Sequence, residues 1–113
     1  MTDAVEKTFV HPNFEDLPAY GLLKPIFDKV CEQYRMTFVG LLDGRTPLPL
    51  EARQVCCWLA NKLQLRLTYT EIADVLGRSR NTAERAVEAI ERQRVEDAWL
   101  REVTDRLLAE LRA

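Results

Sequence analysis

Residues 68–90 read TYTEIADVLGRSRNTAERAVEAI, and the organisation of the chain is clearest in this stretch. Thr68 and Glu71 have the spacing of a capping box, in which two side chains satisfy free backbone N–H groups at the start of a helix. The helix is short, because Gly77, which readily takes the positive φ of a sharp turn, follows its apolar residues at once. The stretch therefore predicts two helices joined by a tight turn over residues 77–80.

The second helix of this pair begins with basic and polar side chains. Ser79 or Asn81 caps it, and helical spacing turns one apolar stripe inward. The stripe contains Ala83, Val87 and Ile90. Two helices joined by a short glycine-containing turn, the second basic and polar at its start, are typical of a helix-turn-helix, whose second helix enters the major groove of DNA. We expect this motif at about 68–94; the alternative is a helical hairpin in which Ala73 and Gly77 serve packing alone.

Helical spacing of apolar residues continues on both sides of the pair. The first expected helix is Leu22–Arg35, with Pro25 in its first turn, and a short second helix begins after Thr37, which caps it, and ends at Gly44. A loop over 44–50 leads to a third helix at about Glu51–Leu65, and the last helix is Asp97–Arg112. Val39, Trp58 and Trp99 are expected to point into the core, with a base-stacking platform as the alternative for the tryptophans. No segment has strand periodicity, so we expect an all-α fold with five to six helices.

Residues 1–19 differ from the rest of the chain. Polar residues, the pair His11-Pro12 and Pro18 interrupt a few scattered aromatic residues, with neither helical nor strand periodicity. A chain of 113 residues suits one hydrophobic core. We therefore expect an N-terminal arm over 1–19 and a single domain over 20–113.

The charge of the chain is unevenly distributed. A formal net charge of −2 argues against an indiscriminate nucleic-acid binder, which would carry a strong basic excess. Residues 45–94, however, hold nine Lys/Arg and six Asp/Glu, a local charge of +3 against −5 elsewhere. The apolar runs are far shorter than the roughly 20 residues that cross a bilayer, and no secretory leader is visible. We expect a soluble, cytoplasmic protein without a membrane partner.

No catalytic or metal-binding constellation can be assembled from the sequence. The three cysteines, Cys31, Cys56 and Cys57, leave one unpaired in any disulfide scheme and favour reduced, buried thiols, with a redox sensor at the vicinal pair as the alternative. His11 is the single histidine and has no ligand partner at motif spacing. Because no acid and base pair, activated nucleophile or phosphate loop is present, we expect no enzyme activity, no cofactor and no metal.

The flanks of the helix pair carry a family resemblance. Its residues are the run from Glu71-Ile72-Ala73 to Ile90-Glu91, preceded by Ala52-Arg53-Gln54-Val55 and Leu59-Ala60 and followed by Glu96-Asp97-Ala98-Trp99-Leu100-Arg101. Together they resemble the C-terminal origin-binding domain, domain IV, of the bacterial replication initiator DnaA, without its ATPase module. The resemblance runs from about Ile26 to Leu111. It implies a helix-turn-helix of the Trp repressor/replication-initiator type.

The recognition motif of that family is a glycine followed by Arg-Asp-His-Thr-Thr and an aliphatic residue, and it falls on residues 77–83. Positions Gly77, Arg78 and Thr82 match, whereas Ser79, Arg80 and Asn81 replace the Asp, the His and the first Thr. The base-reading surface therefore differs from that of the initiator. The arginine-rich loop of the family is represented here by Arg45 alone, so we expect weaker DNA binding.

The expected function is sequence-specific binding of double-stranded DNA in the regulation of replication or transcription. The expected DNA contacts are Arg78, Ser79, Arg80, Asn81, Thr82, Arg85, Arg45 and Arg53. Arg80 could pair with guanine and Asn81 could read adenine, while the others suit phosphates. The alternative is a protein-interaction module of the same fold that has lost its DNA contacts and regulates the replication machinery through a partner protein.

Other charged residues of the second helix have two interpretations each. Glu84 and Glu88 either weaken DNA binding or pair with Arg80 and Arg92, to which they are suitably spaced. Near the end of the helix, Arg92 and Arg94 could contact phosphate or complement the helix dipole in solvent.

Overall fold

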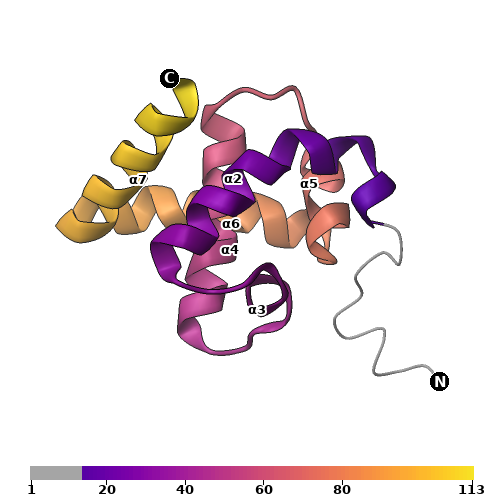
Figure 1. The fold of residues 1–113 in the computed structure, drawn as a ribbon. Coiled ribbons are helices and arrows are strands. Elements are labelled where there is room, and N and C mark those ends of the chain that lie inside the picture. The colour runs from indigo at the N-terminus through magenta and orange to yellow at the C-terminus, as the bar shows by residue number, and fades with distance from the viewer. Residues whose placement is uncertain (1–13) are drawn as a thin grey trace.

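The computed structural model of the protein describes residues 14–113, which form six α-helices and one turn of 3-10 helix and contain no strand (Figure 1). The elements are η1 (Phe14–Asp16), α2 (Pro18–Tyr34), α3 (Phe38–Asp43), α4 (Pro47–Lys62), α5 (Tyr69–Leu76), α6 (Arg80–Glu96) and α7 (Ala98–Arg112). The expected all-α fold is confirmed. Most of the expected arm, including His11 and Pro12, lies outside the described residues.

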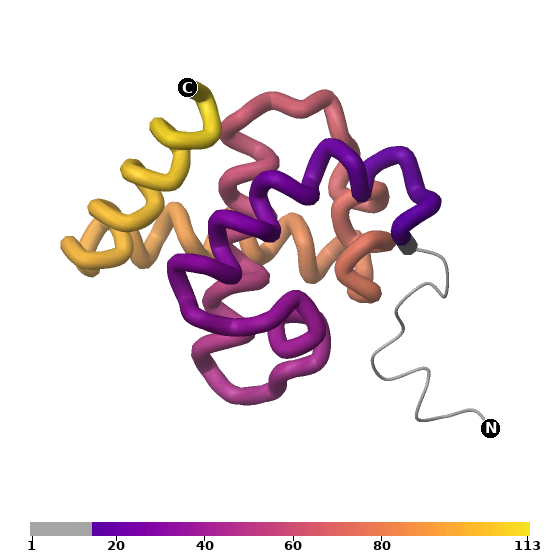
Figure 2. Tube along the Cα trace, viewed as in Figure 1, coloured from indigo at the N-terminus to yellow at the C-terminus, as the bar shows by residue number. Residues whose placement is uncertain are grey.

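Helix α4 is the centre of the fold, since α2, α3, α5, α6 and α7 all pack against it. Figure 2 shows α2 crossing in front of α4, while α6 passes behind α4 and continues into α7. The end of α7 returns to the end of α4, where the Arg112 guanidinium donates to the Lys62 carbonyl at 3.1 Å. This arrangement leaves one long side of α6 at the surface.

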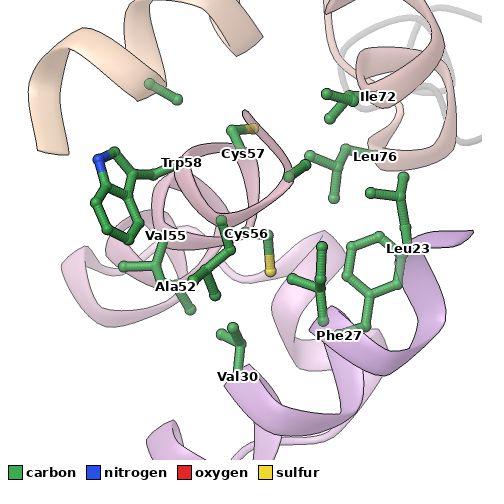
Figure 3. Close-up of a cluster of buried hydrophobic side chains, with 14 of the residues drawn as sticks. Leu23, Phe27, Val30, Ala52, Val55, Cys56, Cys57, Trp58, Ile72 and Leu76 are labelled. Atoms are coloured by element: carbon green, nitrogen blue, oxygen red, sulfur yellow. The ribbon is translucent and has the colours of Figure 1, made fainter. Parts of the chain in front are cut away.

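The core forms where the apolar stripes of these helices meet. In Figure 3, Leu23, Phe27 and Val30 of α2 face the buried side of α4, with residues of α5 above them. The α4 contribution includes Ala52, Val55, Cys56 and Cys57, each at most 2 % exposed. Burying a side chain such as leucine or valine stabilises the fold by about 1.5–3 kcal/mol, so this contact holds the helices together.

Two α-helices begin earlier than the sequence predicts, and one turn of 3-10 helix lies inside the expected arm. Helix α2 begins at Pro18 instead of Leu22, which leaves Pro25 in its interior, and η1 precedes it inside the expected arm. Helix α4 begins at Pro47 instead of Glu51 and ends at Lys62, so most of the expected loop over 44–50 is helical. Proline is well suited to the first turn of a helix, because the N–H it lacks would have no helical partner there.

Two of the side chains expected in the core are at the surface. Val39 is 66 % exposed and Trp99 is 52 % exposed. Helix α3 has only six residues and turns Leu41 and Leu42 inward but not Val39, and Trp99 lies in the first turn of α7 with its ring edge against Tyr34. Trp58 is buried as expected.

The cysteines are unpaired thiols. Cys56 and Cys57 are buried and Cys31 is half-buried. Burial raises the pKa of the Cys57 thiol to about 12 and that of Cys56 well above its ordinary value. Their burial makes the vicinal pair part of the core, and a thiol that stays protonated is a poor nucleophile. None of the helices formed by residues 14–113 is long and apolar enough to cross a membrane.

Candidate nucleic-acid interface

The helix pair α5–α6 has the local structure expected from the sequence. The Thr68 hydroxyl accepts from the Glu71 N–H at 3.1 Å, and the Glu71 carboxylate accepts from the Thr68 N–H at 2.8 Å, which completes the capping box. Gly77 takes the left-handed conformation with φ 69°. The Arg78 N–H then closes the end of α5 on the Ala73 carbonyl at 2.9 Å. A turn of residues 77–79 therefore separates the two helices.

The start of α6 is capped by Ser79 and not by Asn81. The Ser79 hydroxyl accepts from the Thr82 N–H at 3.2 Å and also shares a hydrogen bond with the Thr82 hydroxyl. The expected stripe of Ala83, Val87 and Ile90 is buried. Because these residues turn inward, Asn81 and the side chains one and two turns after it face solvent.

Arg80 lies on the side of α6 that faces the start of α5. Its guanidinium forms an ion pair with Glu84 at 3.0 Å, as the spacing predicted. The same group lies over the ring of Tyr69, 5.8 Å from its centroid. Arg80 is therefore held at the surface by one residue of its own helix and one of the preceding helix.

Two of the expected DNA contacts also have a packing role that the sequence did not reveal. The Arg78 guanidinium donates to the Leu42 carbonyl at 2.8 Å, which ties the turn between α5 and α6 to the end of α3. The Arg53 guanidinium donates to the carbonyls of Leu41 and Gly44, both at 2.8 Å. Both side chains are half-buried beside the same segment. No local motif signals these bonds, because each partner lies nine or more residues away.

A groove of about 270 Å³ lies between α4 and α6, and we call it the arginine groove. Its charged lining consists of Arg53, Arg78, Arg85 and Arg92, and no carboxylate lines it. The apolar part of its lining is Leu50, Cys57, Leu76, Ala83, Ala86 and Ala89. The three alanines leave the space that makes this side of α6 concave. The groove gathers four of the expected DNA contacts, Arg53, Arg78, Thr82 and Arg85, and adds Arg92.

The arginine groove is electropositive and partly shielded from water. Burial lowers the pKa of Arg53 and Arg78, and the proximity of Arg78 lowers that of Arg53 further. Arg45 lowers the pKa of Arg78 in the same way, while Asp43 opposes the change. Arginine nevertheless stays charged at neutral pH. Within residues 14–113, no carboxylate forms an ion pair with any of the four arginines that line the groove.

The exposed side of α6 carries positive and negative charge next to each other. Arg85 and Arg92 are seven residues apart, about two turns, and share the side of the arginine groove. The acidic strip, which consists of Glu84, Glu88 and Glu91, runs directly beside them, and Glu88 lies one turn from both Arg85 and Arg92. Glu91 pairs with Lys62 of α4 at 2.5 Å. The expected pair between Glu88 and Arg92 is not formed, and Glu88 has no ion pair in the described part of the chain.

Arg94 points away from this surface. Its guanidinium lies over the Trp58 ring, 4.7 Å from the centroid, and pairs with Asp105 of α7 at 2.8 Å. It also donates to the Thr104 hydroxyl. Arg94 therefore joins α6 to α7. Its side chain is engaged in these contacts, so it is placed neither to contact phosphate nor to complement the helix dipole in solvent.

Within residues 14–113, no three His, Cys, Asp or Glu side chains come together in a way that could hold a metal ion. Comparison of the sequence with protein-family models and with curated proteins finds no match.

Proposed function

We propose that this protein binds double-stranded DNA, with α6 in the major groove and the sugar-phosphate backbone along the arginine groove. The observation that carries the proposal is the set of four arginines, two of them from α6, that line the groove between α4 and α6, which no carboxylate lines. Arg53 and Arg78 are half-buried and repel each other, so a bound phosphate lowers their electrostatic energy. Each neutralised phosphate also releases condensed counterions, which is the main source of non-specific affinity.

The reading of sequence is proposed for the first turn of α6. Arg80 and Asn81 are exposed there, and their side chains match donors and acceptors that guanine and adenine present in the major groove. The positive end of the helix dipole supports phosphate contacts at the same place. The resemblance to domain IV of DnaA favours a role in the regulation of replication or transcription.

Selection of duplexes from a random pool tests the proposal. We expect one sequence family to be enriched, and the protein to bind it more tightly than random DNA. Random DNA should bind in the range of about 10⁻⁴ to 10⁻⁶ M, with an affinity that falls as salt rises. Binding weaker than this range, without any enriched sequence, contradicts the proposal.

A second candidate, a protein-interaction module, is favoured by the acidic strip and by exposed apolar side chains near the end of α6. The acidic strip would repel DNA. Val95 and Trp99, beyond the strip at the junction with α7, are 75 % and 52 % exposed. Large exposed apolar side chains mark contact surfaces when they cluster. Failure of the duplex selection favours this candidate.

A further inference from the structure

The acidic strip includes one residue that is joined directly to the proposed reading surface. Glu84 holds the Arg80 guanidinium at 3.0 Å, and the two side chains are 40 % and 56 % exposed. Among residues 14–113, Arg80 donates a hydrogen bond to Glu84 alone, through a single terminal nitrogen. A guanidinium has five N–H donors, so this pair leaves donors for a ligand.

Glu84 is the carboxylate that pairs with Arg80, and its chemistry towards DNA differs from that of the basic and polar side chains at the start of α6. A carboxylate accepts hydrogen bonds and repels phosphate, so it lowers affinity for most DNA. In the major groove it is matched by the N4 amino group of cytosine. Adenine also has an amino group, but its neighbouring N7 acceptor repels the second carboxylate oxygen.

The spacing of the pair suits two neighbouring bases. Arg80 and Glu84 are one helical turn apart, about 6 Å along the axis, and both side chains extend from the same side of α6. Successive bases on one strand are about 3.4 Å apart. Flexible side chains of this length cover the difference, and Tyr69 limits the directions open to Arg80.

We propose that Glu84 is a specificity-determining residue, which selects cytosine through its carboxylate and positions Arg80 for a neighbouring or paired guanine. The inference rests on the proposed DNA binding. The Glu84 carboxylate repels the phosphates of any DNA. This repulsion is offset only where the N4 amino group of cytosine donates a hydrogen bond to the carboxylate. Glu84 thus acts mainly against wrong sequences.

The test compares duplex selection by the wild type, Glu84→Gln and Glu88→Gln. Both variants remove one negative charge from the acidic strip, and Glu88 is exposed and without an ion pair in the described residues. We expect both to bind random DNA more tightly than the wild type. Only Glu84→Gln should lose preference for cytosine at one position, by about 5- to 100-fold.

The outcomes separate the inference from the proposed function. If the wild type enriches a sequence and Glu84→Gln keeps the same cytosine preference, the inference is wrong and DNA binding stands. Equal loss of preference in both variants also overturns it, because bulk charge would then explain the effect. If the wild type enriches nothing and binds random DNA more weakly than about 10⁻⁴ M, the proposed function fails and the inference with it. Unchanged melting temperatures establish that the variants are folded.

Discussion

At the scale of single residues, the arginines of the interface fall into two kinds. Arg53 and Arg78 are half-buried and donate to backbone carbonyls of the segment around α3. Arg80 and Arg85 are exposed. A substitution of Arg53 or Arg78 therefore affects stability and DNA contact together. A substitution of Arg80 or Arg85 tests DNA contact alone.

Arg78→Ala and Arg85→Ala form a matched pair. Arg78→Ala leaves the Leu42 carbonyl without its charged donor, so we expect a loss of about 1.5–3 kcal/mol in the free energy of unfolding. Arg85→Ala should change it by less than about 0.5 kcal/mol. If Arg85 contacts phosphate, its loss should weaken all duplexes alike and reduce the salt slope by about one unit. Denaturant unfolding and salt titrations measure both; equal stability of the two variants would contradict the packing role of Arg78.

Arg80→Ala tests base reading. We expect a loss of about 1–3 kcal/mol in binding to a selected duplex, with relaxed preference at one base pair. Stability should hardly change, since the exposed pair with Glu84 contributes about 0.3–0.5 kcal/mol. Titration of the selected duplex and of versions changed at each position measures both effects. A uniform loss across all duplexes would show Arg80 to be a phosphate contact.

At the scale of elements, the turn between α5 and α6 depends on one backbone conformation. Gly77 has φ 69°, where a side chain clashes with the backbone. Gly77→Ala should therefore destabilise the fold by about 1–2 kcal/mol. The control is Gly21→Ala in α2, where an added methyl group would meet no atom within 4 Å. In a helix interior that change should stabilise by about 0.5–1 kcal/mol. Thermal unfolding followed by circular dichroism distinguishes the two, and shifts of the same sign would contradict the left-handed turn.

At the scale of the whole molecule, the buried cysteines report on the integrity of the core. Cys56 and Cys57 are 1 % and 2 % exposed, whereas Cys31 is half-buried near the surface of α2. We expect iodoacetamide to label Cys31 first and the vicinal pair only when the protein unfolds. Mass spectrometry of the time course measures this. Labelling of Cys57 at the rate of Cys31, with denatured protein as the reference, would mean that the core opens locally.

The same thiols predict how stability depends on pH. Burial raises the pKa of Cys57 from 9.0 to about 12, so the unfolded chain loses this proton at a lower pH than the folded chain. The contribution to stability is therefore complete below about pH 9 and is lost as the pH rises towards 12. Tyr34, whose pKa is raised by burial and by its bond to Glu51, acts in the same direction. Melting temperatures should fall across this interval, and Cys57→Ala should reduce the slope.

Local features were predicted well because their causes lie within a few residues. The capping box of Thr68 and Glu71 and the left-handed turn at Gly77 depend on neighbours in sequence, and both are present. Helical spacing in the sequence does not reveal the first turns of α2 and α4, because Pro18 and Pro47 stand there and proline both interrupts and begins helices. The sequence predicts a buried Trp99, but the side chain is exposed in the first turn of α7. An apolar stripe shows which side of a helix faces the core and not which of its turns reach the core.

The sequence by itself determined that the chain is helical and where its best-defined helix pair turns, because capping, helical spacing and glycine conformation are short-range effects. Only the tertiary structure decided which charges share a surface. Arg53 of α4 meets Arg78 and Arg85 because α4 and α6 pack together, and Arg94 is turned instead towards Trp58 and α7. Charged side chains from distant segments become neighbours only when the helices pack together, and the spacing of residues along the chain does not predict this packing.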